Sequence, residues 1–393
     1  MEAVGEMMRC LPPVGRPLDM RSARRLLPEF TGFESLWLNS GTAALSVACS
    51  IARRAYPKVT SPKVILPAYG CPDLVAAAVF AGVTPVLVDI GSEDPGYDLN
   101  ALEQALSDQV VAVIAVNFLG IRERVESIQA LTEQRGILLI EDRAQSFPEE
   151  LLGKEGSGLA DMVLTSFGRG KPVNLMGGGL LLVAERWQGL LQCWREDSYA
   201  RSGLGLVSGL GNKGGTFTYR TKAHVFNRLL HSGIYYWLNL LPFLKLGVTE
   251  YHPLLNISTM SADEATYAGS NIFGYVNGER SAELWYSSKL SNSDGVKLLP
   301  KLLASRAGRM LRYPLLASTL EGASRKKLLE SGLGVSSFYG QALVDIPSVI
   351  DKVEITGTLD GSRHFAKSLL TLPVHTAVRE ADLQAILRLL AAK

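Results

Sequence analysis

Short apolar runs alternate with amphipathic stretches between Gly41 and Ala184. The apolar runs are five to seven residues long, most are rich in Val, Ile and Leu, and they begin at Lys63, Thr84, Val110, Ile137, Met162 and Gly178. Runs of this length and composition are typical of strands buried on both faces. The amphipathic stretches between them predict helices over Gly41–Tyr56, Pro72–Gly82, Leu99–Leu106 and Val125–Arg135. The alternation predicts an α/β fold with a mostly parallel central sheet, helices on both faces, and a ligand site beyond the carboxyl ends of the strands.

The pattern changes after Trp187. Ser202 to Gly215 holds six glycines and two serines, which predicts a loop. An apolar, aromatic segment follows from His224 to Val248, and the last third, from Ala265, has the pattern of a smaller α+β domain. The predicted divisions are an N-terminal arm (1–25), a large α/β domain (26–200), an inserted loop and aromatic helical segment (201–255) and a small C-terminal domain (256–393).

Charge and cysteine content exclude several classes of protein. The 393 residues carry 40 Lys and Arg against 38 Asp and Glu, a formal net charge of +2, which argues against a nucleic-acid binder. The four cysteines have no C-x-x-C spacing, so neither a disulfide framework nor a metal site is expected. The first residues lack the apolar core of a signal peptide, and no apolar run reaches the ~18 residues of a spanning helix. We therefore predict a cytoplasmic protein.

Residues 39–45, NSGTAAL, place small and hydroxyl-bearing side chains where the first predicted helix begins. The free N–H groups and the dipole of a helix N-terminus attract anions, and the Thr42 hydroxyl adds a further donor. The same residues also suit an ordinary helix cap.

Residues 141–145, EDRAQ, directly follow the predicted strand GILLI. This places Asp142 at a strand end, where its carboxylate can pair with a buried cation. Asp residues at strand ends also cap helices, so this signal leaves both interpretations open.

Residues 165–171, TSFGRGK, follow the next strand. Glycines around one lysine let the backbone pass close to a ligand, and a partly desolvated lysine becomes a nucleophile. A solvated loop lysine is the alternative. The segment is not a P-loop, because Pro172 follows Lys171 and Thr165 stands in place of the first glycine.

Together, an anion-binding helix start, a strand-end Asp and a Lys after the next strand outline a pyridoxal-phosphate site. At these residues the sequence resembles the DegT/DnrJ/StrS family of sugar aminotransferases, which are fold-type I pyridoxal-phosphate enzymes. The resemblance extends over SGTAAL (40–45), ILPAYGCP (65–72), TPVLVDI (84–90), YDLNALEQAL (97–106), EDRAQS (141–146), SFGRGK (166–171), GGG (177–179) and LTLPVH (370–375).

The resemblance implies a role for each matched residue. Lys171 is expected to form the Schiff base with pyridoxal phosphate and then to carry the proton as general acid–base. Asp142 is expected to pair with the pyridine nitrogen, Gln145 to bind the ring hydroxyl, and Ala144 to pack on one face of the ring. The phosphate is expected to lie against Gly41, Thr42, Ala43 and Ser166.

Three positions depart from the family pattern. Cys71 stands where an aromatic residue commonly covers the second face of the ring, with Tyr69 two residues earlier. Asn256 is the nearest match to an Asn that reaches the neighbouring subunit's phosphate, although Ser258 replaces the usual Arg. A His-Tyr-Pro motif near the substrate reads Phe-Tyr-Gly at 338–340, which puts a standard nucleotide-sugar substrate in question.

The resemblance implies a homodimer with shared active sites and a transfer of an amino group, from a donor such as glutamate, to a keto group of a sugar or related metabolite. A dehydration or condensation on the same scaffold is one alternative. The sugar dehydratases of the family replace the lysine with histidine, so the retained Lys171 argues against that reaction. A non-enzymatic cofactor-binding regulator is a second alternative, and retention of Asp142, Gln145 and Ser166 argues against it.

The aromatic segment His224–Val248 has three interpretations: a lid over the substrate entrance, a peripheral membrane contact, or a buried dimer interface. Asn227, Arg228, His231 and Asn239 fall within one half of a continuous helix and leave an apolar half that includes Trp237. Aromatic runs at helical spacing are more often core, which favours the interface.

Overall fold

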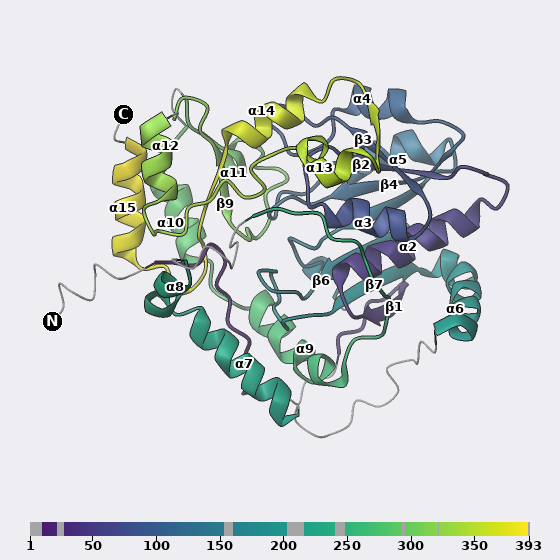
Figure 1. Ribbon diagram of the computed structural model, residues 1–393, viewed down its shortest axis with the longest axis horizontal. Helices are drawn as coiled ribbons and strands as arrows, with labels where there is room; N and C mark the ends of the chain where they lie inside the picture. The colour runs from purple at the N-terminus through teal and green to yellow at the C-terminus, as the bar shows by residue number, and fades with distance from the viewer. Residues whose placement is uncertain are drawn as a thin grey trace.

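The computed structural model describes residues 10–21, 27–152, 160–202, 216–239, 248–292, 295–320 and 322–391. Its centre is an eight-stranded sheet with the order β1-β7-β6-β5-β4-β2-β3-β10 (Figure 1). The bounds are β1 (Phe33–Leu38), β2 (Lys63–Pro67), β3 (Thr84–Val88), β4 (Val110–Val116), β5 (Leu138–Asp142), β6 (Met162–Ser166), β7 (Gly179–Ala184) and β10 (Glu354–Thr356).

Six of these strands run parallel, from β10 through β3, β2, β4 and β5 to β6, while β7 and β1 pair antiparallel at the other edge. The six apolar runs of the sequence are the strands β2 to β7, so the predicted parallel sheet is confirmed. The sequence pattern missed β1, because FESLWL buries fully only Leu36 and Leu38. It also missed β10, a three-residue edge strand from a distant part of the chain.

Helices cover both faces of the sheet, as predicted. One apolar cluster packs α2 (Gly41–Ala55), α3 (Asp73–Phe80) and α6 (Gln188–Ser202) on one face. The other cluster holds side chains of α4 (Leu99–Ala105), α5 (Val125–Glu133) and α9 (Ala262–Val276). Layers of this kind leave the carboxyl edge of the parallel strands as the open side of the sheet.

A second, three-stranded sheet has the order β11-β9-β8 and is entirely antiparallel. Its strands are β8 (Lys297–Leu298), β9 (Tyr313–Leu316) and β11 (Leu369–Leu372), with a separate apolar core under α10 (Ser281–Lys289), α12 (Gly322–Leu329) and α15 (Glu380–Ala391). The short helix α11 (Leu299–Leu302) lies between β8 and β9, α13 (Pro347–Ile350) precedes β10, and α14 (Asp360–Ser368) connects β10 of the central sheet to β11. The expected smaller α+β unit is therefore present, whereas its division from the rest at residue 256 stays a prediction, since α9 packs against the central sheet.

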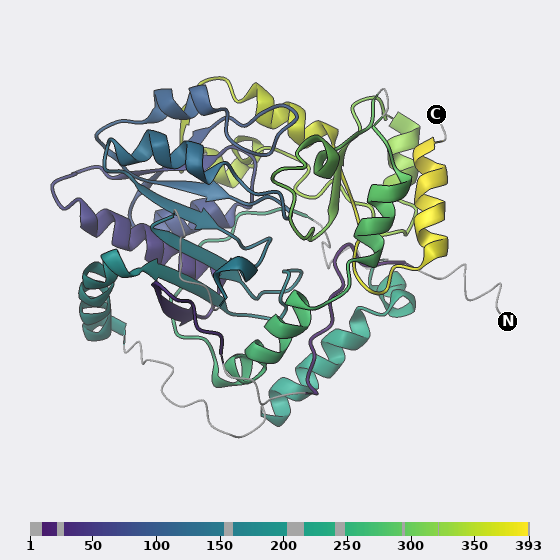
Figure 2. The same ribbon diagram turned by 180° about the vertical axis from the view of Figure 1, so that it is seen from behind.

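The segment after α6 forms α7 (Phe217–Leu229) and α8 (Ser232–Asn239), which lie along one side of the molecule (Figure 2). The sequence analysis treated 227–239 as one continuous helix. That premise is wrong, because the chain turns at Leu230 and His231 between two helices. Asn227, which the helical count grouped with the polar half, bonds the backbone N–H and C=O of Leu18 in the arm. The glycine-rich stretch 203–215, Pro242 and Phe243 lie outside the described residues.

Candidate active site

The carboxyl ends of β5 and β6 bring Asp142 and Ser166 to one edge of the sheet. The two strands are parallel neighbours with Asp142 opposite Leu164. The loop after β2 adds Cys71, and the start of α2 adds Gly41 and Thr42 to the same edge. The structure thus gathers residues from four separate motifs of the sequence at one place.

Asp142 is a buried carboxylate, with 6% of its surface exposed. Its Oδ1 accepts a hydrogen bond of 2.7 Å from the Ala144 backbone N–H, and no described residue donates to Oδ2. Burial raises the pKa of Asp142, although the Ala144 N–H and the charge of Lys171 act in the opposite direction. A cation brought to Oδ2 would stabilise the charged form of this carboxylate, which is what a protonated pyridine nitrogen requires.

Lys171 lies in the loop between β6 and β7. The preceding residue, Gly170, has a φ of +75°, a backbone conformation that glycine adopts without strain. The lysine is close enough to Asp142 and Cys71 for its charge to lower the pKa of both groups. The loop therefore brings the lysine of the SFGRGK motif near the strand-end carboxylate, and its predicted bond to the cofactor stays a prediction.

The start of α2 packs directly on Ser166. A Cβ atom at Gly41 would lie 2.5 Å from Ser166 Cβ, so only glycine fits at this position. Ser40 Oγ caps the helix by accepting a 3.0 Å hydrogen bond from the Ala43 N–H, and Thr42 Oγ1 donates to Asp73 Oδ2 at 3.2 Å. Both the plain cap and the hydroxyl-lined helix start expected from NSGTAAL are therefore present.

Gln145 is buried and joins the large sheet to the small unit. Its Oε1 accepts from the Leu119 N–H at 2.9 Å, and its Nε2 donates to Tyr339 Oη at 2.7 Å. The ring of Tyr339 lies 5.7 Å from that of Tyr69. The sequence analysis treated 338–340 only as a departure from a family motif and missed that Tyr339 lines this site.

Cys71 lies beside the same residues. Burial, with a smaller contribution from the charge of Asp73, raises its pKa to about 12, although the charge of Lys171 acts in the opposite direction. A raised pKa favours the protonated thiol, and a protonated thiol is a poor nucleophile.

Asn256 is exposed and lies next to the start of α2 in its own chain. Its Oδ1 accepts a 3.1 Å hydrogen bond from Asn39 Nδ2, and Asn39 also accepts from the Ser258 N–H. The predicted contact of Asn256 with a partner's phosphate stays a prediction.

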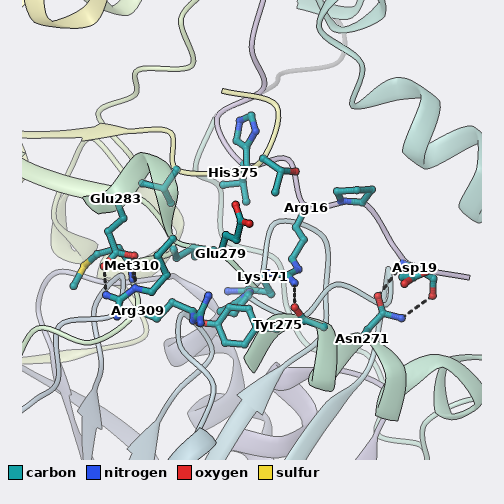
Figure 3. A pocket seen from close by; sticks show the side chains of 18 of the residues that line it. Arg16, Asp19, Lys171, Asn271, Tyr275, Glu279, Glu283, Arg309, Met310 and His375 are labelled. Atoms are coloured by element: carbon teal, nitrogen blue, oxygen red, sulfur yellow. Dashed lines mark hydrogen bonds and ion pairs between the residues drawn. The ribbon is translucent and has the colours of Figure 1, made fainter. Parts of the chain in front are cut away.

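A cavity of about 340 Å³ opens next to Lys171, between the arm, α9 and the small unit (Figure 3). Apart from Lys171 and His375, which end two of the matched motifs, the sequence motifs gave no signal for the residues named here, because they come from distant segments of the chain. The lining residues include Arg16, Lys171, Tyr275, Glu279, Arg309 and His375.

These residues fit pyridoxal phosphate. A lysine amine stands near a buried carboxylate with one oxygen that accepts no hydrogen bond, and a helix start with Thr42 and Ser166 lies beside them for a phosphate. Lys171, Asp142, Ser166 and Thr42 would hold the cofactor, and Gln145 and Cys71 would border it.

The sheet order, the second small sheet and the lysine after β6 give the chain the fold of the fold-type I pyridoxal-phosphate-dependent transferases. Residues 26–187 match the model of the DegT/DnrJ/EryC1/StrS aminotransferase family, which confirms the resemblance over these residues. A 3-aminotransferase of UDP-N-acetyl-3-dehydro-α-D-glucosamine from Acidithiobacillus ferrooxidans is 27% identical over 179 residues, 44% of this chain and 48% of that protein. The chain thus matches about half the length of this curated relative.

Two solved structures illustrate the fold match. A DegT DnrJ EryC1 StrS aminotransferase from Brucella abortus has a TM-score of 0.65 at 19% identity, covering 92% of this chain and 86% of that one. The GDP-4-keto-6-deoxy-D-mannose-3-dehydratase of E. coli, solved with hydrated pyridoxal phosphate, has a TM-score of 0.69 at 14% identity, covering 98% and 100%. Among the helices described, none is long and apolar enough to cross a membrane.

Proposed function

We propose that this protein is a pyridoxal-phosphate-dependent aminotransferase that moves an amino group from a donor such as glutamate onto a keto group of a sugar or related metabolite. The observation that carries the proposal is the gathering of buried Asp142, Ser166 and the start of α2 at the carboxyl edge of the parallel strands, with Lys171 in the loop that follows β6. The family matched by residues 26–187 and the UDP-sugar aminotransferase from A. ferrooxidans support the same activity.

When bound, pyridoxal phosphate supplies an electron-withdrawing ring. Asp142 keeps a proton on the ring nitrogen through charge–charge attraction in a site with little water. Thr42, Ser166 and the start of α2 hold the phosphate and orient the ring. The Lys171 amine would act as the general acid–base, taking the proton from the substrate carbon and donating it again during amino transfer.

A dehydration is the second candidate, since the E. coli dehydratase shares the fold. Lys171 favours amino transfer, because its amine can both attach the cofactor and carry the proton. We also propose a homodimer in which Asn256 contributes to the neighbouring site.

The test combines attachment and turnover. Borohydride should fix the cofactor to the purified protein, and peptide mapping should find it on Lys171. Glutamate should convert the cofactor to its amine form, which absorbs at a shorter wavelength, and release 2-oxoglutarate. Attachment at another lysine would contradict the assigned site, and attachment at Lys171 without any amino transfer from glutamate or another amino donor would contradict the proposed activity.

A further inference from the structure

The amide of Gln145 has only one orientation that satisfies its neighbours. Its Oε1 accepts a hydrogen bond of 2.9 Å from the Leu119 backbone N–H, a group that can act only as a donor. The amide nitrogen Nε2 therefore faces the other way, and it donates to Tyr339 Oη at 2.7 Å. Because Nε2 carries two N–H groups, one of them still has no acceptor among the described residues.

The Tyr339 hydroxyl is a donor without an acceptor. A hydroxyl that accepts from an amide must direct its own O–H to a different group, and none of the described residues accepts it. Burial raises the pKa of Tyr339 well above its ordinary value, and nearby Cys71 and Asp142 raise it further. The hydroxyl therefore keeps its proton at neutral pH, beside residues that would border the cofactor.

The two partners of Gln145 lie in strained turns. Leu119 has a φ of +53°, and Phe338, the residue before Tyr339, has a φ of +60°, a left-handed conformation that residues other than glycine rarely adopt. The Phe338 N–H donates to Ser336 Oγ at 2.9 Å, and the rings of Phe338 and Tyr339 lie 4.4 Å apart. Strained backbone persists where surrounding contacts enforce it, and it clusters at functional sites. The turn thus holds Tyr339 against Gln145 at a cost in stability.

The two donors lie close enough together to serve one acceptor. Their heavy atoms, Gln145 Nε2 and Tyr339 Oη, are 2.7 Å apart, and an oxygen about 2.7–3.0 Å from each would complete a triangle with ordinary hydrogen-bond lengths. The family resemblance assigns Gln145 to the ring oxygen of pyridoxal phosphate, with Asp142 at the ring nitrogen. An oxygen that Gln145 Nε2 reaches is therefore within reach of the Tyr339 hydroxyl as well.

We propose that Tyr339 is a second hydrogen-bond donor, beside Gln145, to the ring oxygen of the bound cofactor. The small unit then supplies one contact to a cofactor whose other partners belong to the large α/β domain. The oxygen carries negative charge next to the link between cofactor and Lys171, and two donors stabilise that charge. A stabilised oxygen attracts the proton of the link less strongly, so the link loses this proton at a lower pH. The inference rests on the proposed function for the bound cofactor, but its test needs no turnover.

The test is a pH titration of the absorption band of the cofactor-loaded protein, without any amino donor. Tyr339→Phe keeps the aromatic ring and removes only the hydroxyl. The midpoint of the titration should rise by about one pH unit or more, the shift that corresponds to the loss of one hydrogen bond to a charged group. An unchanged or lowered midpoint would overturn the proposal. Tyr286→Phe is the matched control and should leave the midpoint unchanged. It removes another buried hydroxyl, one without a hydrogen-bond partner among the described residues, from the core of the small unit.

A second comparison separates a donor from a residue that only orients Gln145. Gln145→Ala removes the amide, and Tyr339→Phe is then added to that variant. If Tyr339 donates to the ring oxygen, the midpoint rises again on the second change. If Tyr339 acts only through Gln145, the second change has no effect and the proposed donor is wrong. Gln145→Met, which fills the same space, takes the place of the alanine variant if that one does not fold.

The two proposals fail separately. If the protein transfers amino groups from glutamate but its midpoint is indifferent to Tyr339→Phe, only the second donor is wrong. If the midpoint moves as expected but no amino group is transferred, only the proposed activity is wrong. If borohydride fixes no cofactor on Lys171, both are wrong.

Discussion

The cleft around Lys171 has two walls of different origin. The cofactor wall comes from one stretch, residues 40–171, in which consecutive strands of a parallel sheet end side by side. The opposite wall is assembled from the arm, α9, the segment before β9 and residues 374–376. These segments are up to 362 residues apart, as at Val14 and Thr376. The residues of the cofactor wall lie together because the carboxyl ends of parallel strands meet at one edge of the sheet. The residues of the opposite wall are brought together by tertiary contacts, such as those of Asn227 and Asn271 with the arm.

Because the two walls differ in origin, we assign a different part of the proposed amino transfer to each. Pyridoxal-phosphate chemistry needs a lysine, an acid and a phosphate cradle in a fixed order, and these belong to the region that matches the family model. We propose that the choice of substrate depends on the opposite wall, most of which lies outside the matched residues 26–187. The five predictions below separate these two contributions, from the largest expected effect to the smallest.

Replacing Lys171 with Ala should abolish amino transfer, with a loss of at least about 10²–10⁴-fold from proton transfer alone. The cofactor should still bind through the contacts at Thr42 and Ser166, without a covalent link. Absorbance spectra and stopped-flow mixing with glutamate measure both. Lys58→Ala, at an exposed position, is the control. A variant that turned over normally would place the catalytic amine elsewhere.

Asp142→Asn keeps the shape of the side chain and removes the charge near the ring nitrogen. Loss of one such electrostatic contact should slow the half-reaction with glutamate by about 10²–10³-fold, while cofactor affinity falls much less. Single-turnover rates and cofactor titration separate the two effects. Near-normal turnover would show that Asp142 serves only to bond the Ala144 N–H.

Asn271→Ala tests the opposite wall. It removes both hydrogen bonds to Asp19 and loosens the arm that presents Arg16. We expect kcat/KM to fall about tenfold, mainly through KM, because two hydrogen bonds contribute about 1–3 kcal/mol together. The cofactor spectrum should be unchanged. An equal loss of cofactor binding would show that the two walls are not independent.

The sequence predicted the cofactor wall well. The six buried strands, the helix start at Gly41 and the strand-end position of Asp142 follow from local pattern, and the structure has them. Cys71 was expected at the site by resemblance; the loop after β2 brings it to the same edge of the sheet as Asp142, and its contact with the cofactor stays a prediction. Local pattern works here because consecutive βα units bring residues together by chain order alone.

The other wall could not be predicted, for a physical reason. Arg16 and Arg309 lie 293 residues apart, and only the ring of Tyr275 and the end of α9 bring them together. No periodicity or motif encodes such a contact. The prediction of one continuous helix over 227–239 failed for a related reason. The chain turns at Leu230 and His231, and Asn227, just before the turn, bonds Leu18 of the distant arm.

Trp237→Glu distinguishes the three interpretations of α7 and α8. Trp237 is 57% exposed and Phe217 is 87% exposed, and residues 216–239 contain Arg220, Lys222 and Arg228 but no acidic side chain. If the segment contacts a membrane, the variant should no longer float with anionic vesicles. If it forms a dimer interface, the variant should sediment as a monomer. If it is a lid, the variant should be less protected from hydrogen exchange in the substrate complex. Thr218→Glu adds the same charge on α7 without removing an aromatic ring, and it should behave like the wild type in each assay.

The smallest effect concerns the stability of the cofactor-free protein. Burial raises the pKa of Asp142 above its ordinary value of about 3.9, so the folded state disfavours the charged carboxylate. Above the raised pKa the charge is present in both states and lowers the free energy of unfolding. Between the ordinary and the raised value, the folded state binds the proton more tightly, and this penalty disappears as the pH falls.

Asp142→Asn should therefore unfold at a slightly higher urea concentration than the wild type near neutral pH, and the difference should shrink in acid. With cofactor bound the order should reverse, because the ring nitrogen then pairs with the carboxylate. If the cofactor-free wild type were more stable than the Asn variant at neutral pH, Asp142 would contribute to the stability of the fold. Asp142 could then not be assigned to the cofactor wall alone.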